Sequence, residues 1–204
     1  IGLEKNGFLY VDEIVVPEAV SFPSRLDKAP VPGTIMVPRN LDRSKKHPAI
    51  VWIHGSGSDQ NFLGWHPGSY RMYYSASVYL AQQGYIILAP DYRGSSGYSR
   101  DWATGVHMGL GVNDTADVAA GADYLKTLDY VDPDRIGVWG LSYGGFLTLQ
   151  ALNTDPLLWR AGIDVAGVVD WATYGAGYTT PRLGTPVENP DIYKVSAPIL
   201  HMEK

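Results

Sequence analysis

The sequence contains no cysteine, no long apolar segment and no run of like charges. Because cysteine is absent from all 204 residues, disulfide bonds, thiolate metal sites and thiol-based catalysis are excluded for this chain. No apolar stretch approaches the roughly 18 residues of a membrane-spanning helix, and the first residues, IGLEKNGFLY, lack the basic and apolar regions of a secretory signal peptide. We therefore expect a soluble segment without a membrane partner, in either the cytoplasm or the periplasm.

The charge is small and evenly distributed. The formal net charge is -5 at pH 7, and acidic and basic residues are interspersed along the chain. This pattern offers no basic surface for nucleic acid, so we expect no nucleic-acid partner. Hydrophobic residues make up 45% of the sequence, which is typical of globular proteins, and 204 residues are enough for one well-buried domain.

Segments with strand and helix patterns alternate along most of the chain. Most strand segments are uninterrupted apolar runs, so the alternation predicts a mostly parallel sheet with helices on both faces. The first two strands, separated by the turn-rich residues 23–32, are expected to form a hairpin at a sheet edge. The expected strands cover residues 19–22, 33–38, 49–55, 85–91, 136–140 and 161–169, residues 131–135 form a turn, and the expected helices cover residues 70–84, a segment capped by Asn113, and residues 144–152.

Ser142 stands at the centre of a Gly-x-Ser-x-Gly motif that runs from Gly140 to Gly144. The motif falls between an expected strand and an expected helix, which is the context of a nucleophile elbow. In that geometry the serine hydroxyl stands at the carboxyl end of the strand, and the free amides of the helix N-terminus face a developing oxyanion. Ser142 is therefore the candidate nucleophile, and an incidental serine in a glycine-rich turn is the alternative.

The loop HGSGSDQ, after the strand at residues 49–55, is the candidate source of a second oxyanion donor. Ser56 lies between Gly55 and Gly57, which would allow its backbone N–H to face the substrate carbonyl. A flexible loop of common turn-forming residues is the alternative. We assign no catalytic role to His54, because a histidine at a strand end is more often packed and hydrogen-bonded.

Three aromatic residues follow the last expected strand. Trp171, Tyr174 and Tyr178 are spaced by three and four, so they would project from one face of a helical turn. Such an aromatic wall would bind a compact apolar side chain beside the nucleophile. Packing of these residues in the core is the alternative. Arg93 is expected to brace loops through its several donors rather than to contact substrate.

Four stretches together carry a resemblance to a known family: WIHGSGS, PDYRGSSGYSRDW, YVDPDRIGVWGLSYGGF and GTPVENPDIYKVSAPI. From about Glu18 to its last residue, the chain resembles the hydrolase domain of the prolyl oligopeptidase family of serine peptidases, which includes dipeptidyl peptidases and acylaminoacyl peptidases. The resemblance implies an α/β-hydrolase fold, truncated here before its last strands. It also implies hydrolysis of short peptides through an acyl-enzyme, without a metal or other cofactor.

The resemblance assigns roles to individual residues. Ser142 matches the nucleophile of the family, and the backbone N–H of Tyr143 matches an oxyanion donor, with Ser56 as the second donor. The remaining matched residues correspond to the pocket that, in the dipeptidyl peptidases, accepts proline or alanine just before the cleaved bond. These pocket residues are Val168, Trp171, Tyr174 and Tyr178, together with the ring of Tyr143.

The base and acid of a catalytic triad do not follow from this sequence. In the α/β-hydrolase fold they come after the nucleophile, in the order Ser, Asp, His. The only histidine after Ser142 is His201, which lies in a stretch resembling the family's segment before its next strand, so we do not expect it to be the base. The carboxylates after Ser142 are Asp155, Asp164, Asp170, Glu188, Asp191 and Glu203.

We therefore expect the triad Asp and His to lie beyond residue 204, and this segment to be inactive alone. Residues 1–18 are interpreted as a linker or the tail of a preceding domain, and residues 19–204 as an incomplete hydrolase domain. Activity is expected to need the missing C-terminal strands and an N-terminal β-propeller domain of the kind the family carries. A carboxylesterase and a catalytically silent binding module remain the alternatives, and the sequence does not distinguish exopeptidase from endopeptidase action.

Overall fold

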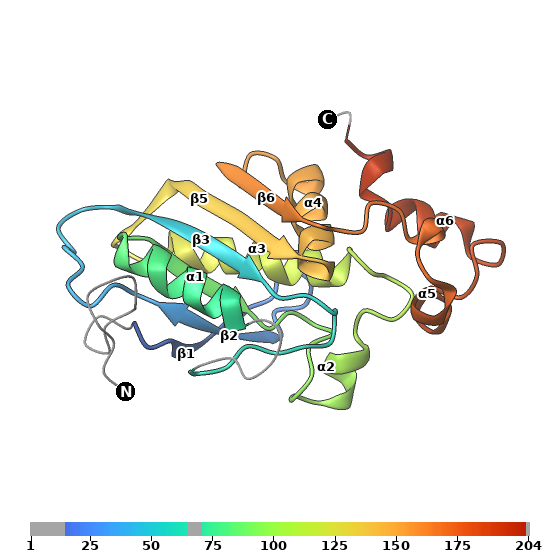
Figure 1. Ribbon diagram of the computed structural model, residues 1–204, viewed down its shortest axis with the longest axis horizontal. Helices are drawn as coiled ribbons and strands as arrows, with labels where there is room; N and C mark the ends of the chain where they lie inside the picture. The colour runs from blue at the N-terminus through green and yellow to red at the C-terminus, as the bar shows by residue number, and fades with distance from the viewer. Residues whose placement is uncertain (1–14, 65–70, 203–204) are drawn as a thin grey trace.

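The computed structural model describes residues 15–64 and 71–202, and they form a six-stranded sheet covered by helices (Figure 1). The strand order is β1-β2-β4-β3-β5-β6. The expected hairpin is present, because β1 and β2 pair antiparallel at one edge of the sheet, and β2 is also antiparallel to β4. The other pairs, β4 with β3, β3 with β5 and β5 with β6, are parallel, which confirms the mostly parallel sheet. The strands are β1 (Glu18–Pro23), β2 (Pro30–Met36), β3 (His47–Ile53), β4 (Ile86–Pro90), β5 (Val131–Leu141) and β6 (Ala161–Val165).

The central strands bury apolar side chains on both faces of the sheet. In β4, Ile86 and Leu88 pack into a large core with α3 and α4, whereas Ile87 and Ala89 pack on the opposite face with α1. Because successive side chains of a strand point to opposite faces, this arrangement requires the uninterrupted apolar runs seen in the sequence. The helices that cover the two faces are α1 (Arg71–Gln82) on one side and α3 (Asn113–Lys126) and α4 (Tyr143–Thr154) on the other (Figure 1).

The short helices lie toward the carboxyl ends of the parallel strands. There a group of short elements lies beyond the point where β3, β5 and β6 end; one of them follows β4 and the others follow β6 (Figure 1). These elements are α2 (Arg100–Thr104), the 3-10 helix η2 (Trp171–Thr173), α5 (Ala176–Leu183), α6 (Pro190–Val195) and the 3-10 helix η3 (Pro198–Leu200). Within the described ranges, no helix combines the length and apolar character needed to cross a bilayer.

Several local predictions were wrong. Asn113 is the first residue of α3, not its N-cap, and its side-chain amide donates to the Gly105 carbonyl at 3.1 Å. The expected turn at residues 131–135 belongs to β5, as an irregularity in its pairing with β3. The strand expected at residues 161–169 ends at Val165, because Ala166 adopts a left-handed φ of 53° and turns the chain. The expected linker at residues 1–18 lies mostly outside the described residues, and Glu18 begins β1.

Candidate active site

Ser142 occupies a sharp reversal between β5 and α4. Its backbone has φ 58° and ψ −115°, a conformation that costs energy for any residue with a Cβ and persists only where the surroundings fix it. Two hydrogen bonds supply that constraint: Ser142 N–H donates to the Val165 carbonyl at 2.8 Å, and Phe146 N–H donates to the Ser142 carbonyl at 3.0 Å. The expected strained turn is therefore present. The Ser142 residue is half-buried, so it remains accessible to solvent.

The glycines of the motif are required by close backbone contacts. A Cβ at Gly140 would lie 2.5 Å from the Gly144 carbonyl group, and a Cβ at Gly144 would overlap the Ile53 carbonyl oxygen of β3. Any side chain at these positions would therefore push the helix away from the strands. The elbow depends on the glycines two residues before and two residues after Ser142.

The residue after Ser142 begins the helix. Tyr143 is the first residue of α4, so its N–H belongs to the N-terminal amides that have no acceptor within the helix. These amides carry the positive end of the helix dipole and lie next to the serine. The Tyr143 N–H is therefore one of the N-terminal amides of α4 that lie directly after Ser142.

The side chain of Tyr143 is buried and hydrogen-bonded. Its hydroxyl donates to Asp114 Oδ2 at 2.6 Å, and both side chains lie in the core beside α3. Burial raises the pKa of Asp114 to about 6, although the bond from Tyr143 favours the charged form, and burial also raises the pKa of Tyr143 well above its ordinary value. No local pattern in the sequence marks this pair, because an acid near a helix N-terminus is the only signal at Asp114.

The loop after β3 reaches the same place. Ser56 has a left-handed φ of 65°, and its carbonyl accepts a hydrogen bond from the Tyr178 hydroxyl at 2.9 Å. At the neighbouring Gly57, a Cβ would lie 3.1 Å from both a ring carbon of Tyr143 and the Tyr178 hydroxyl. The structure therefore brings together three of the predicted site residues, Ser56, Tyr143 and Tyr178, which come from three separate segments of the chain.

His54 lies at the start of this loop and packs against the segment after β4. It is 1% exposed, and its ring stacks on Tyr92 with 4.4 Å between ring centroids. Its Nε2 lies 2.9 Å from Ser95 Oγ, while the Tyr92 hydroxyl donates to the His54 carbonyl at 2.9 Å. Asp91 lies 3.7 Å from the same imidazole nitrogen, and burial raises the pKa of its carboxyl group. The expectation that His54 is packed and hydrogen-bonded is confirmed.

The aromatic residues cluster, but not on one helix. Trp171 lies in η2 and Tyr178 in α5, and the extended backbone of Tyr174 (φ −85°, ψ 164°) separates the two helices, so the predicted single helical turn was wrong. Trp171 stacks on Tyr178 at 5.4 Å, and Tyr174 meets both rings edge-on at 5.4 and 5.6 Å. Trp171 is only 2% exposed, whereas Tyr174 is 47% exposed and Val168 is half-buried against the core.

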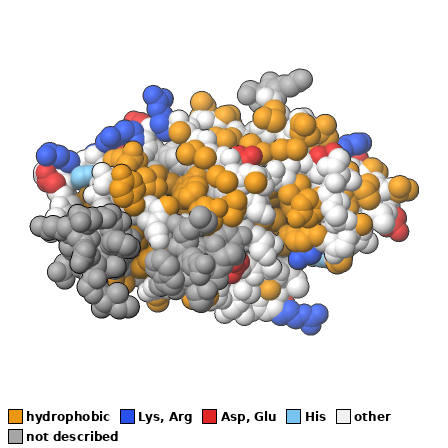
Figure 2. Space-filling model, in the orientation of Figure 1, with side chains coloured by type: hydrophobic (Ala, Val, Ile, Leu, Met, Phe, Trp, Pro, Cys, Tyr) orange, Lys and Arg blue, Asp and Glu red, His pale blue; other side chains and the backbone are white. Residues whose placement is uncertain are grey.

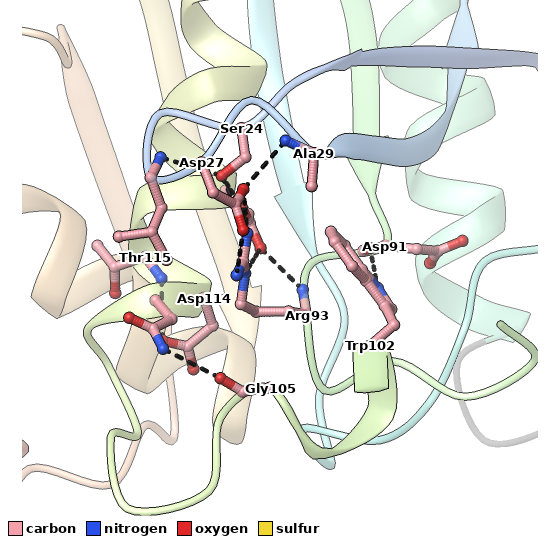
Figure 3. Close-up of polar contacts among 12 residues, drawn as sticks. Ser24, Asp27, Ala29, Asp91, Arg93, Trp102, Gly105, Asp114 and Thr115 are labelled. Carbon is pink, nitrogen blue, oxygen red and sulfur yellow. Dashed lines mark hydrogen bonds and ion pairs between the residues drawn. The ribbon is translucent and has the colours of Figure 1, made fainter. Parts of the chain in front are cut away.

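Arg93 braces the turn between β1 and β2, as expected (Figure 3). Its Nε donates to Asp117 Oδ2 of α3 at 2.8 Å, and a terminal nitrogen donates to Asp27 Oδ1 of the hairpin turn at 3.0 Å. Ser24 of the same turn donates its hydroxyl proton to Asp117 Oδ1 at 2.5 Å. This network fastens the β1–β2 turn and the segment after β4 to α3. None of these contacts involves Ser142.

No triad partner meets the serine in the part of the chain that the structure describes. There, no side chain forms a hydrogen bond with the Ser142 hydroxyl, and His201 instead pairs its Nε2 with the Lys194 carbonyl at 3.0 Å. The carboxylates of Asp164 and Asp170 accept backbone N–H groups of nearby turn residues. Among the described residues, Ser142 therefore has neither a histidine nor a carboxylate as a side-chain hydrogen-bond partner.

Comparison with known proteins settles the family. A sequence model described as the prolyl oligopeptidase family matches residues 71–204, more than half of the chain. The chain belongs to the prolyl oligopeptidase family. Among the curated members of this family, a probable dipeptidyl-aminopeptidase B of Grosmannia clavigera is 34% identical over 161 residues, covering 78% of this chain and 16% of the relative. Another, from Talaromyces stipitatus, is 29% identical and covers 96% of this chain and 21% of the relative.

Solved structures of prolyl oligopeptidase family members have the same fold. The dipeptidyl peptidase 4 of Porphyromonas gingivalis aligns with a TM-score of 0.81 and 31% identity over 92% of this chain and 26% of that structure. The acylaminoacyl peptidase of Pyrococcus horikoshii aligns with a TM-score of 0.77 and 28% identity over 92% of this chain and 30% of that structure. The sheet, its covering helices and the serine elbow are those of an α/β-hydrolase, and the chain spans less than a third of these peptidases.

Proposed function

We propose that this chain is the nucleophile-bearing part of a serine peptidase. The observation that carries the proposal is Ser142, which stands in a left-handed elbow directly before the free amides of α4. The Ser142 oxygen attacks the carbonyl carbon of a peptide bond and its proton passes to the base; the bond to the leaving amine then breaks as that amine takes up a proton. Water hydrolyses the resulting acyl-enzyme and restores the serine. The N–H groups of Tyr143 and Ser56 hold the oxyanion.

The aromatic cluster supports a substrate with a small apolar residue before the cleaved bond. Tyr174 and Tyr178 are the more open rings of the cluster, and Trp171 and Tyr143 pack behind them. Such a wall suits a compact side chain such as proline or alanine, because stacked rings bury much apolar area with little loss of entropy. Val168, Trp171, Tyr174, Tyr178 and Tyr143 form this proposed pocket. The probable dipeptidyl-aminopeptidases among the relatives are consistent with short peptide substrates.

The base and acid are proposed to come from further strands that pair with β6. This strand is an edge with exposed side chains, including Ile163 at 61% exposed. Beside it, a groove of about 580 Å³ runs between α1 and the sheet, and its lining is mainly apolar, as in Leu80 and Trp139. Figure 2 shows hydrophobic side chains gathered on this face. Additional strands and a covering helix would bury this surface, which would otherwise favour aggregation. An N-terminal propeller over the site is part of the same proposal.

A peptidase assay tests the proposal. In the intact protein we expect hydrolysis of alanyl or prolyl p-nitroanilide, a loss of more than about 1000-fold in Ser142→Ala, and unchanged activity in the surface variant Ser44→Ala. The 204-residue segment alone should be nearly inactive. Ordinary turnover by the segment alone, abolished by Ser142→Ala, would show that the base lies within it. Retained activity of Ser142→Ala in the intact protein would show that Ser142 is not the nucleophile.

A further inference from the structure

Tyr178 connects the proposed pocket to the proposed oxyanion loop. Its ring lies between two neighbours: Trp171 stacks on one side at 5.4 Å with an interplanar angle of 13°, and the guanidinium carbon of Arg182 lies 3.8 Å from its centroid. Arg182 also donates to the Tyr178 carbonyl at 3.0 Å. These contacts fix the direction of the ring. The hydroxyl at its end donates to the Ser56 carbonyl at 2.9 Å, across a separation of 122 residues.

Ser56 needs such a constraint. A left-handed conformation is unfavourable for a serine, and it is retained only where neighbouring groups fix it. The Tyr178 hydroxyl holds the peptide group between Ser56 and Gly57 from one side. On the other side, Gly57 fits closely against the Tyr143 ring, where a Cβ would lie 3.1 Å from a ring carbon. Both contacts therefore limit rotation of the backbone that carries the Ser56 N–H.

We propose that the Tyr178 hydroxyl is a positioning group that sets the Ser56 amide for oxyanion binding, so that a side chain of the pocket wall also orders the oxyanion loop. This proposal rests on the proposed peptidase function. The hydroxyl does not touch the reacting atoms; it acts through the Ser56 carbonyl. Its loss should leave the pocket ring in place and release the loop, so that transition-state stabilisation falls more than substrate binding.

The variant Tyr178→Phe in the intact protein tests this inference. Phenylalanine keeps the stacking with Trp171 and Arg182 and removes only the bond to Ser56. Deleting one oxyanion donor outright costs about 100-fold to 1000-fold in kcat, and a displaced donor should cost less. We expect kcat on prolyl p-nitroanilide to fall about 10-fold, with KM changed less than about 2-fold. Affinity for a prolyl boronic acid, which forms a tetrahedral adduct, should fall by a similar factor.

Tyr193→Phe is the matched control. Tyr193 is buried nearby, and its hydroxyl also donates to a backbone carbonyl, that of Gly184 at 2.9 Å, without contact to Ser56. We expect this variant to keep the kcat of the parent protein. An equal fall in both variants would mean a general loss of stability and would overturn the inference, and so would a rise in KM alone for Tyr178→Phe.

A second variant approaches the same loop from the other side. Gly57→Ala introduces a Cβ 3.1 Å from the Tyr143 ring and from the Tyr178 hydroxyl, at a residue with φ +70°. It should also lower kcat more than it raises KM. Ser142→Ala in the same assay keeps the two proposals distinct. If Ser142→Ala is inactive while Tyr178→Phe and Gly57→Ala have parent kcat values, the positioning role is wrong and the peptidase proposal stands.

Discussion

The two sides of the candidate site are held in place by different kinds of contact. On the elbow side, backbone packs directly on backbone: Gly144 leaves no room for a Cβ against the Ile53 carbonyl, and Gly140 leaves none against Gly144. On the loop side, residues 54–58 are held by side chains, among them Tyr178 on the Ser56 carbonyl and Tyr92 on the His54 carbonyl. Ser142 is thus fixed by backbone contacts, and the loop by side-chain hydrogen bonds that single substitutions can remove.

This difference predicts different responses to mutation. A backbone contact cannot give way without moving a whole strand or helix, because protein interiors are close-packed. A side-chain hydrogen bond contributes only about 1 kcal/mol net, and its loss can be absorbed locally. Substitutions that break a backbone contact on the elbow side should therefore abolish folding and activity together, whereas substitutions that remove a side-chain hydrogen bond of the loop should lower activity by degrees.

The largest effect is expected for Gly144→Ala, which would break the backbone contact on the elbow side. Its Cβ would overlap the Ile53 carbonyl oxygen, so α4 must move away from β3. We expect a loss of more than about 4 kcal/mol in the free energy of unfolding and no detectable peptidase activity. Urea unfolding followed by circular dichroism, with the p-nitroanilide assay, measures both.

Gly109→Ala is the control for that variant, because a Cβ there meets nothing within 4 Å. Its free energy of unfolding should lie within about 0.5 kcal/mol of the parent value. If Gly144→Ala instead folds with near-parent stability and partial activity, then the elbow side has the tolerance that we assign to the loop side. The comparison would then fail.

The elbow was predictable from sequence because its rule is local. The glycines flanking Ser142, a buried strand before them and a helix after them all lie within the strand–helix unit from Val131 to Thr154, and each requirement follows from backbone geometry. The parallel core was predictable for a similar reason, since uninterrupted apolar strands must be covered on both faces. The boundary at Val165 was missed, because the bend at Ala166 depends on the backbone conformation of one residue.

The supports of the site were not predictable, because they join distant segments. The bond from Tyr178 to Ser56 and the bond from Tyr143 to Asp114 link residues 122 and 29 positions apart, and no local pattern marks either partner. The aromatic residues were selected by helical spacing, yet they meet through the packing of two short helices. Here residues that do form a cluster were selected through a wrong local structure.

An intermediate effect is expected for Asp117→Ala, which tests how deeply the loop side is anchored. Asp117 is fully buried and accepts bonds from the Arg93 side chain, the Arg93 backbone N–H and Ser24. Its removal leaves the Nε of the buried Arg93 without its carboxylate acceptor, and among the described residues only Asp27 remains as an ion-pair partner. We expect the free energy of unfolding, measured by urea denaturation, to fall by about 3–4 kcal/mol. Asp155→Ala, which removes a partner of the more exposed Arg25, should cost less than about 1 kcal/mol.

The Asp117→Ala and Asp155→Ala variants could instead lose similar free energies of unfolding. In that case, burial would not be the source of the stability of the Arg93 network. The loop segment after β4 would then be no better anchored than the surface. A large loss confined to Asp117→Ala would instead place the rigid support of the loop side at Arg93. On the loop side, only the residues nearer Ser56 would then be free to move.

The smallest effect is a pH dependence on the elbow side, carried by Asp114 beneath Tyr143. Burial raises the pKa of this carboxyl from 3.8 to about 6, so the folded state holds the proton more tightly than the unfolded state does. The contribution of Asp114 to stability is therefore fully present below about pH 4 and is lost as the pH rises to about 6, by up to about 3 kcal/mol. Asp114→Asn removes this titration while its amide oxygen still accepts from Tyr143.

The difference in unfolding free energy between Asp114→Asn and the parent should therefore rise in favour of the variant between about pH 4 and pH 6, then stay constant. If the unfolding free energies of the variant and the parent protein instead changed in parallel with pH, the pKa of Asp114 would be unshifted. Its carboxyl group would then not be buried in solution. A rise accompanied by unchanged kcat would mean that the backbone contacts alone fix the nucleophile. A rise accompanied by altered kcat would mean that the elbow also depends on a side chain, which would narrow the contrast between the two sides of the site.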